Sequence, residues 1–130
     1  MDDTTARQLQ TRATPLELIN LEEPNETRHF EKGRVDLYHV GPATLGRATY
    51  EPGSRWSEHV APTAGTASCQ VEHVGLVLRG QAAVKMADGT ERVMKEGDFF
   101  YVPPGHDSWV VGDEPYVSLH FVGGERYALK

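Results

Sequence analysis

Short runs in which apolar and polar residues alternate dominate the chain from Val35 onward. A period of two is typical of half-buried β-strands, and glycine, proline or Asp-Gly turns separate the runs. The pattern predicts roughly nine to eleven strands and no convincing helix, which favours an all-β sandwich or barrel. The main predicted strands are 35–40, 44–50, 56–61, 69–78, 82–86, 92–94, 99–102, 109–111 and 117–122.

The clearest local signal is the pair Asp88-Gly89 between strands 82–86 and 92–94. Asp-Gly favours the positive φ angles that a tight hairpin turn requires. We therefore predict that these two strands form a hairpin.

The first 22 residues differ from the rest of the chain, and we predict a division into segment 1–22 and a domain of residues 23–130. Residues 1–13 have no hydrophobic periodicity, so we expect this part to be mobile. Three leucines, Leu16, Leu18 and Leu21, indicate a short strand or turn that docks on a neighbour. Residues 23–27 are polar and contain a proline, which predicts a connection.

Composition limits the class of protein. A chain of 130 residues with 38% hydrophobic and 25% charged residues is expected to form one globular domain. The single cysteine excludes an internal disulfide, and the polar N-terminus does not resemble a secretory signal, so we expect a cytoplasmic protein. No apolar run approaches the roughly 18 residues of a membrane span. Thirteen basic and 19 acidic side chains give a net charge of −6, which argues against nucleic-acid binding.

Glycines, prolines and histidines recur at regular spacings between residues 53 and 109. Five residues separate Gly53 from His59, and six separate His73 from Gly80. A Gly-x5-Pro-x-Gly pattern follows at Gly97, Pro103 and Gly105. This arrangement resembles the cupin superfamily.

The resemblance has three departures from the usual cupin pattern. Ala61 stands where the family has a second histidine, and His73 replaces the family's acidic ligand. Ser108 stands where the last histidine is expected, but His106 lies two residues earlier. Residues i and i+2 of a strand share a face, so His106 could point into the same barrel.

The resemblance implies a cupin-type double-stranded β-helix, a jelly-roll-like barrel, and often a homodimer. It also implies a divalent metal inside the barrel, with His59, His73 and His106 as ligands. Imidazole suits several transition metals, and we expect iron, zinc, manganese or nickel. The alternative is that each histidine is an ordinary hydrogen-bonded residue, and that Glu58 and His59 form a solvated pair.

Cys69 lies four residues before His73, which places both side chains on one face of the predicted strand. Its thiolate could provide a further, soft ligand that favours zinc or iron. Cys69 could equally be a small buried hydrophobic residue.

Two residues near this site are candidate acid–base groups. Tyr101, predicted to face the barrel together with Phe99, is the one proton donor of this group. Asp107 could orient a ligand or only stabilise the turn after Gly105. His29, His39 and His120 match no motif and are expected to be structural or surface residues.

Two functions follow from the sequence. The first is a metal-dependent enzyme, such as a dioxygenase, isomerase or lyase, that acts on a small polar metabolite. The second is a binding or sensor module that captures a small ligand without turnover. The fold does not choose between these, whereas nucleophile-elbow, phosphate-loop and dinucleotide motifs are absent from the sequence.

Overall fold

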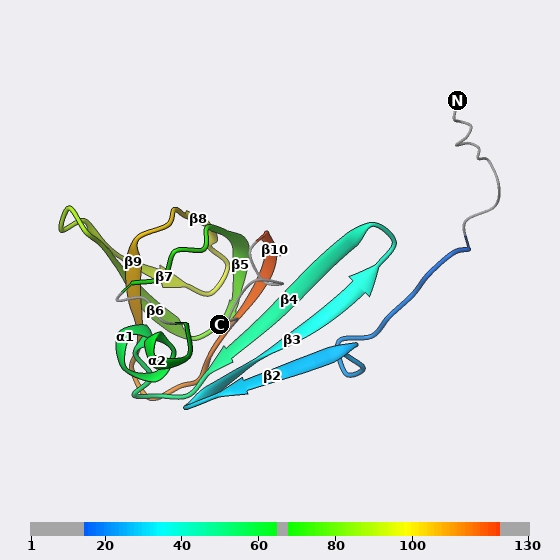
Figure 1. The fold of residues 1–130 in the computed structure, drawn as a ribbon, viewed down its shortest axis with the longest axis horizontal. Coiled ribbons are helices and arrows are strands. Elements are labelled where there is room, and N and C mark those ends of the chain that lie inside the picture. Colours follow the sequence, from blue (N-terminus) through cyan, green and yellow to red (C-terminus); the bar gives the residue numbers. More distant parts are fainter. Residues whose placement is uncertain (1–14, 65–67, 123–130) are drawn as a thin grey trace, which may run out of the picture.

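Two antiparallel β-sheets form the molecule, and the computed structural model describes residues 15–64 and 68–122. The larger sheet has the strand order β2-β3-β4-β10-β5-β8, and the smaller has the order β7-β6-β9 (Figure 1). The strands are β2 Glu26–Phe30, β3 Gly33–Val40, β4 Ala43–Tyr50, β5 His73–Arg79, β6 Gln81–Met86, β7 Glu91–Lys95, β8 Phe99–Val102, β9 His106–Val111 and β10 Tyr116–Val122. The all-β prediction is therefore confirmed.

The predicted hairpin at Asp88-Gly89 is also confirmed. It joins β6 to β7, which pair from Gln81↔Lys95 to Lys85↔Glu91. The Gly89 amide donates to the Met86 carbonyl at 3.0 Å, and Gly89 has a φ of +93°. Glycine adopts this angle without the steric cost that a side chain would add.

The strand β2 was not predicted, because residues 23–27 have the composition of a polar connection. In the structure, Glu26–Phe30 pairs along its whole length with β3, from Glu26↔Leu37 to Phe30↔Gly33. It is an edge strand, and edge strands carry many polar and charged residues because one of their sides faces water. Together β2, β3 and β4 extend beyond the rest of the barrel (Figure 1).

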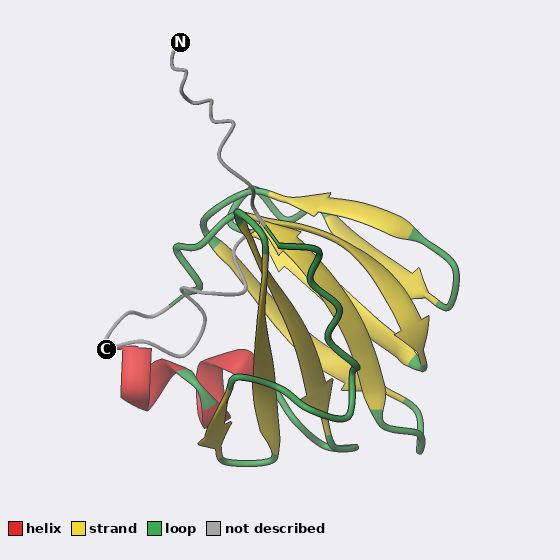
Figure 2. Cartoon of the chain, turned by 90° about the vertical axis from the view of Figure 1, so that its right-hand side faces the viewer, coloured by secondary structure: helices red, strands yellow, loops and turns green. Residues whose placement is uncertain are grey.

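Residues 56–61 form helix instead of the predicted strand. Helix α1 spans Trp56–His59 and α2 spans Ala61–Ala64, and both lie at one end of the sheets (Figure 2). The prediction was wrong because Trp56 and Val60 are four residues apart, which is one helical turn. Both side chains are buried in one cluster with Val35 and Leu37 of β3. Among residues 15–64 and 68–122, no helix is long and apolar enough to cross a membrane.

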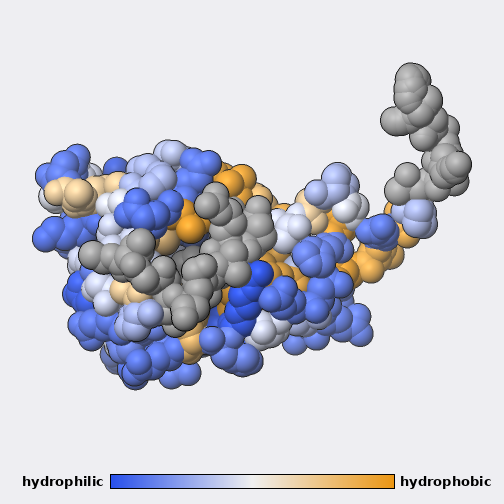
Figure 3. Space-filling model, in the orientation of Figure 1, coloured by the Kyte–Doolittle hydropathy of each residue, from blue (hydrophilic) through white to orange (hydrophobic). Residues whose placement is uncertain are grey.

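The segment that precedes β2 lies against β3 and β4 through polar contacts. The Tyr38 hydroxyl donates to the Leu21 carbonyl at 2.6 Å, and Arg47 Nη2 donates to the same oxygen at 3.1 Å. Leu16 and Leu18 are each 90% exposed, and Figure 3 shows apolar atoms on this segment. The segment thus docks through its backbone and through polar side chains such as Glu17, which accepts from the Gly41 amide at 2.7 Å, while Leu16 and Leu18 remain exposed. Residues 1–13, predicted to be mobile, lie outside the described residues.

The two sheets meet differently along their two sides. On one side, isolated bridges Arg55↔Trp109 and Cys69↔His106 join β9 to the segments before α1 and before β5. On the other side, β7 and β8 follow each other in the chain but pair with β6 and β5, not with each other. The barrel is therefore closed near Cys69 and less tightly joined between β7 and β8.

Candidate metal site

Three side chains from separate segments converge inside the barrel. His73 begins β5, on which His73, Gly75 and Val77 face inward. His106 begins β9, directly after a turn in which Gly105 has a φ of +91°. Cys69 lies before β5 and pairs with His106, since its amide donates to the His106 carbonyl at 2.8 Å.

The distances within this group suit a metal ion. Cys69 Sγ lies 3.5 Å from His73 Nε2. One ligand atom from each of Cys69, His73 and His106 lies within 4.8 Å of the other two, and all three residues are buried. In a tetrahedral zinc site, bond lengths of about 2.3 Å to sulfur and 2.0–2.1 Å to nitrogen place these donors about 3.6 Å apart. The cluster can therefore hold a metal ion without a large rearrangement.

A backbone contact orients His106 for this role. His106 Nδ1 is 2.7 Å from the carbonyl oxygen of Pro103, so Nδ1 must carry the proton and donate it. The lone pair is then on Nε2. A second nitrogen that donates to a carbonyl is the usual arrangement for histidine ligands of metals.

Burial determines the charge of the group. It raises the pKa of the Cys69 thiol to about 11 and lowers the pKa of His73 to about 2, with His120 and His106 adding to the latter shift. Burial also lowers the pKa of His106, although Pro103 and Asp107 oppose the change. At neutral pH and without a cation, the cluster is thus a neutral thiol beside neutral imidazoles.

His59 is not brought into this cluster. Because residues 56–59 are helical, the His59 ring folds back toward the start of α1, where the Arg55 amide donates to Nδ1 at 3.0 Å. Its Nε2 lies 3.9 Å from a carboxylate oxygen of Glu31. The structure instead gives His59 contacts with these two residues.

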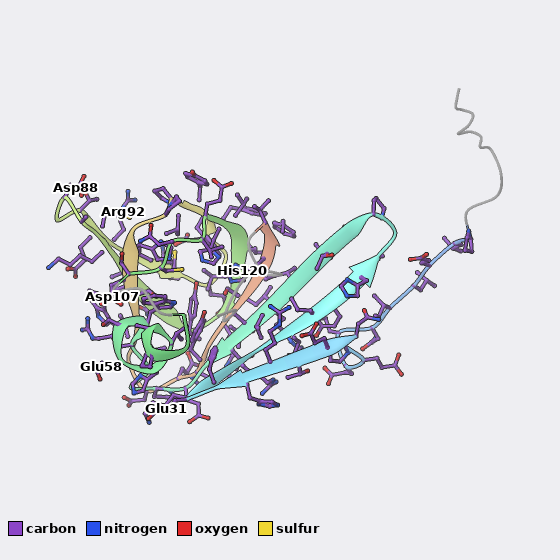
Figure 4. The ribbon with its side chains drawn as sticks, viewed as in Figure 1. Glu31, Glu58, Asp88, Arg92, Asp107 and His120 are labelled. Atoms are coloured by element: carbon purple, nitrogen blue, oxygen red, sulfur yellow. The ribbon has the colours of Figure 1, made fainter. Side chains whose placement is uncertain are left out.

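His120 is the residue that the sequence analysis missed. Its ring lies 5.0 Å from that of His73 and 5.6 Å from that of Phe100, with the pair Gly75↔His120 across the β5–β10 ladder. Figure 4 shows His120 among the barrel strands. The available signal was its alternation with Ser118 in a predicted strand, which places two polar side chains on the same face. By contrast, His29 and His39 are exposed, as expected.

A chamber of about 50 Å³ lies between the sheets beside the cluster. His73, His106 and His120 line it, whereas Cys69 lies behind them. Its polar lining is completed by hydroxyls, and in the described part of the chain no Asp, Glu, Lys or Arg side chain lines it. The hydroxyl-bearing residues are Tyr50, Ser54, Ser108, Tyr116 and Ser118.

Tyr101 points away from the chamber. Phe99 and Tyr101 are 76% and 59% exposed, whereas Phe100 and Val102 face inward, so the predicted direction of strand 99–102 was wrong. The Tyr101 hydroxyl donates to Glu72 at 3.1 Å. The predicted alternation was right, but alternation alone does not say which face is the inner one.

Asp107 holds the start of α1 in place. It accepts hydrogen bonds from the Ser57 amide at 3.0 Å and the Ser57 hydroxyl at 2.9 Å, and Arg55 Nη1 lies 3.3 Å away. Figure 4 places Asp107 on the side of the barrel that carries the helices. These contacts link β9 to α1, and Asp107 does not line the chamber.

Fold and site together define a small β-barrel protein with a buried Cys/His/His cluster. Residues 46–123, more than half of the chain, match the family described as the cupin domain. The chain belongs to this family. A comparison with curated protein sequences gives no significant match.

Solved structures with the same fold come from several organisms. A protein of unknown function from Rhizobium leguminosarum bv. viciae 3841 has 20% identity and a TM-score of 0.59, over 82% of this chain and 95% of that one. A cupin-superfamily sugar phosphate isomerase from Silicibacter pomeroyi has 15% identity and a TM-score of 0.58, over 80% and 73%. KdgF from Halomonas sp. has 17% identity and a TM-score of 0.56, over 82% and 91%. At these identities the similarity shows the cupin fold.

Proposed function

We propose that this cupin binds a divalent transition metal through Cys69, His73 and His106 and acts on or captures a small polar molecule beside it. The observation that carries this proposal is the distance among three buried ligand atoms, each within 4.8 Å of the others. Three protein ligands leave a coordination position for water or substrate, as in catalytic zinc sites. The thiolate favours zinc or iron over manganese.

The proposal is tested by metal content and affinity. Purified protein is stripped with a chelator, titrated with Zn²⁺ or Co²⁺, and compared with the variants Cys69→Ser and His73→Ala. We expect each substitution to weaken binding by more than about 100-fold, because even outer partners of metal ligands contribute about 10–100-fold. His39→Ala is the matched control, since His39 is exposed on β3 and does not belong to the Cys69–His73–His106 cluster. Equal metal content in wild type and His73→Ala would rule out the site.

A metal-free binding module is the second candidate. The same Cys69–His73 distance of 3.5 Å allows the thiol to donate a hydrogen bond to His73 Nε2, so these two atoms are also paired without a cation. In that case the chamber would bind its ligand through hydrogen bonds alone. Ligand binding that survives complete chelation would support this second function.

A further inference from the structure

The inner face of β10 is polar where a barrel core is usually apolar. Tyr116, Ser118 and His120 alternate on this face and are 4%, 1% and 6% exposed. Ser118 Oγ lies 2.9 Å from His120 Nε2, so these two side chains satisfy each other in part. Buried polar groups normally occur only where hydrogen bonds compensate for lost water.

Two buried polar atoms of this face have no hydrogen-bond partner among the described residues. They are His120 Nδ1 and the Tyr116 hydroxyl oxygen, which lies close to the Ser118 side chain without a well-formed hydrogen bond to it. Both residues line the chamber. Leaving such groups unsatisfied costs free energy, so their position on the chamber wall points to a ligand that would hydrogen-bond with them.

The charge of the metal-loaded cluster determines what kind of ligand this is. A divalent cation held by one thiolate and two neutral imidazoles leaves a net charge of +1. No charged side chain of the described residues lines the chamber to compensate it. An isolated charge away from water is strongly unfavourable, and a monoanion would neutralise it.

The volume of the chamber restricts the size of this anion. A cavity needs about 10–15 Å³ to hold one water molecule. The chamber of about 50 Å³ therefore admits a group of only a few heavy atoms. A carboxylate meets both conditions, because it carries one negative charge and two hydrogen-bond acceptors.

We propose that the chamber binds a carboxylate group, with Tyr116 and His120 of β10 as the residues that recognise its oxygen atoms. This inference rests on the proposed metal site, which would supply the positive charge. Tyr116 and His120 are binding residues that act by hydrogen bonding, and they lie outside the Cys69–His73–His106 cluster.

The carboxylate could belong to a free short acid or to the end of a longer molecule. A groove of about 530 Å³ lies along β7 and β8, and its lining includes the charged residues Arg92, Lys95 and Asp98. Four apolar side chains, Val84, Met94, Phe100 and Val102, line both the groove and the chamber. A longer acid would place its apolar chain in this groove, beside the exposed Phe99.

Spectroscopy of the Co²⁺-loaded protein tests the proposal separately from the metal site. The absorption spectrum of Co²⁺ without added anion reports whether the Cys/His/His cluster binds metal. Titration with formate, acetate, butyrate and hexanoate then reports whether a carboxylate binds beside it. Tyr116→Phe removes a single hydroxyl, and His120→Phe keeps an aromatic ring. Tyr38→Phe is the matched control, since the Tyr38 hydroxyl contacts Leu21 outside the chamber.

We expect acetate to change the Co²⁺ spectrum, and Tyr116→Phe and His120→Phe each to weaken acetate about 10-fold, with Tyr38→Phe unchanged. Affinity that rises with chain length identifies the end of a longer molecule, whereas binding of formate and acetate alone identifies a free short acid. A Co²⁺ spectrum that no acid changes overturns this inference and leaves the metal site intact. Equal acetate affinity in Tyr116→Phe, His120→Phe and wild type also overturns it. Failure to bind Co²⁺ overturns both proposals.

Discussion

Cys69 and His106 are paired through their main chains. The Cys69 amide donates to the His106 carbonyl at 2.8 Å, and the Gly105 amide donates to the Cys69 carbonyl at 2.7 Å. Two of the three proposed ligands are thus held together by backbone hydrogen bonds that no metal ion is needed to form.

Removing the metal should therefore leave the fold intact. We expect the far-UV circular dichroism of chelated protein to match that of the metal-loaded protein, with strand dominating the spectrum. Added metal should raise the melting temperature, because binding to the native state alone stabilises it by about 2.7 kcal/mol at 100 times the dissociation constant. Loss of the strand spectrum on chelation would show that the metal organises the barrel.

Cys69 should react slowly with thiol reagents in the native, metal-free protein. It is 2% exposed, and burial raises the pKa of its thiol to about 11, so little thiolate is present at pH 8. It is the chain's single cysteine, so a colorimetric thiol assay reports this residue alone. One equivalent should react after denaturation. Rapid reaction of the native protein would contradict the buried position of Cys69.

Mild acid should destabilise the metal-free protein. Burial lowers the pKa of His120 from 6.5 to about 4 and that of His73 to about 2, so both remain neutral in the fold while the unfolded chain takes up protons. The contribution of His120 and His73 to the free energy of unfolding is present above pH 6.5 and is lost as the pH falls toward the folded-state pKa of each residue. Between pH 6.5 and its folded-state pKa, each histidine lowers the free energy of unfolding by about 1.4 kcal/mol per pH unit.

Urea unfolding between pH 6.5 and 5 would measure this effect before most carboxylates titrate. His120→Phe should flatten the pH dependence of the unfolding free energy, whereas the exposed control His39→Asn should preserve it. If the free energy of unfolding changed equally with pH in His120→Phe and wild type, His120 would be excluded as a source of the pH dependence.

Arg47→Met should lower the free energy of unfolding by about 2 kcal/mol, because the buried Asp36 carboxylate then keeps only Arg34 Nε at 3.3 Å and the Thr27 hydroxyl at 2.8 Å as described side-chain partners. Arg47 Nη2 lies 3.2 Å from Asp36, whose side chain is 4% exposed. The control is Arg79→Met, since Arg79 and Glu114 are 58% and 65% exposed and such pairs contribute about 0–1 kcal/mol. If the two substitutions lowered the free energy of unfolding equally in chemical denaturation, the ion pair of Arg47 with Asp36 would contribute no more than an exposed pair.

Deletion of residues 1–22 should lower stability or dissociate a homodimer. The segment contacts β3 and β4 through Leu21, and the exposed Leu16 and Leu18 are available to a second copy. Light scattering and thermal unfolding of the full-length protein and of the variant without residues 1–22 test this prediction. A monomer in both cases, with the same melting temperature, would count against the dimer. The homodimer and a cytoplasmic location remain predictions.

Local patterns in the sequence predicted the fold class, most strand positions and all three proposed ligands, two of them from motif register and Cys69 from its strand parity with His73. Period-two alternation and Asp88-Gly89 specify strands and a hairpin locally, since each depends on neighbours in the chain. His73 was found through its spacing to Gly80, and His106 through its spacing from Pro103. These signals need no knowledge of long-range contacts.

Long-range packing determines which faces of the strands point inward and which residues share the site. Tyr101 faces outward because strand 99–102 turns Phe100 and Val102 toward the chamber. His59 lies outside the cluster because core packing of Trp56 and Val60 makes residues 56–59 helical. His120 joins His73 through the pairing of β5 with β10, between residues far apart in the chain. Such pairings depend on the burial of whole strand faces, which a local pattern does not specify.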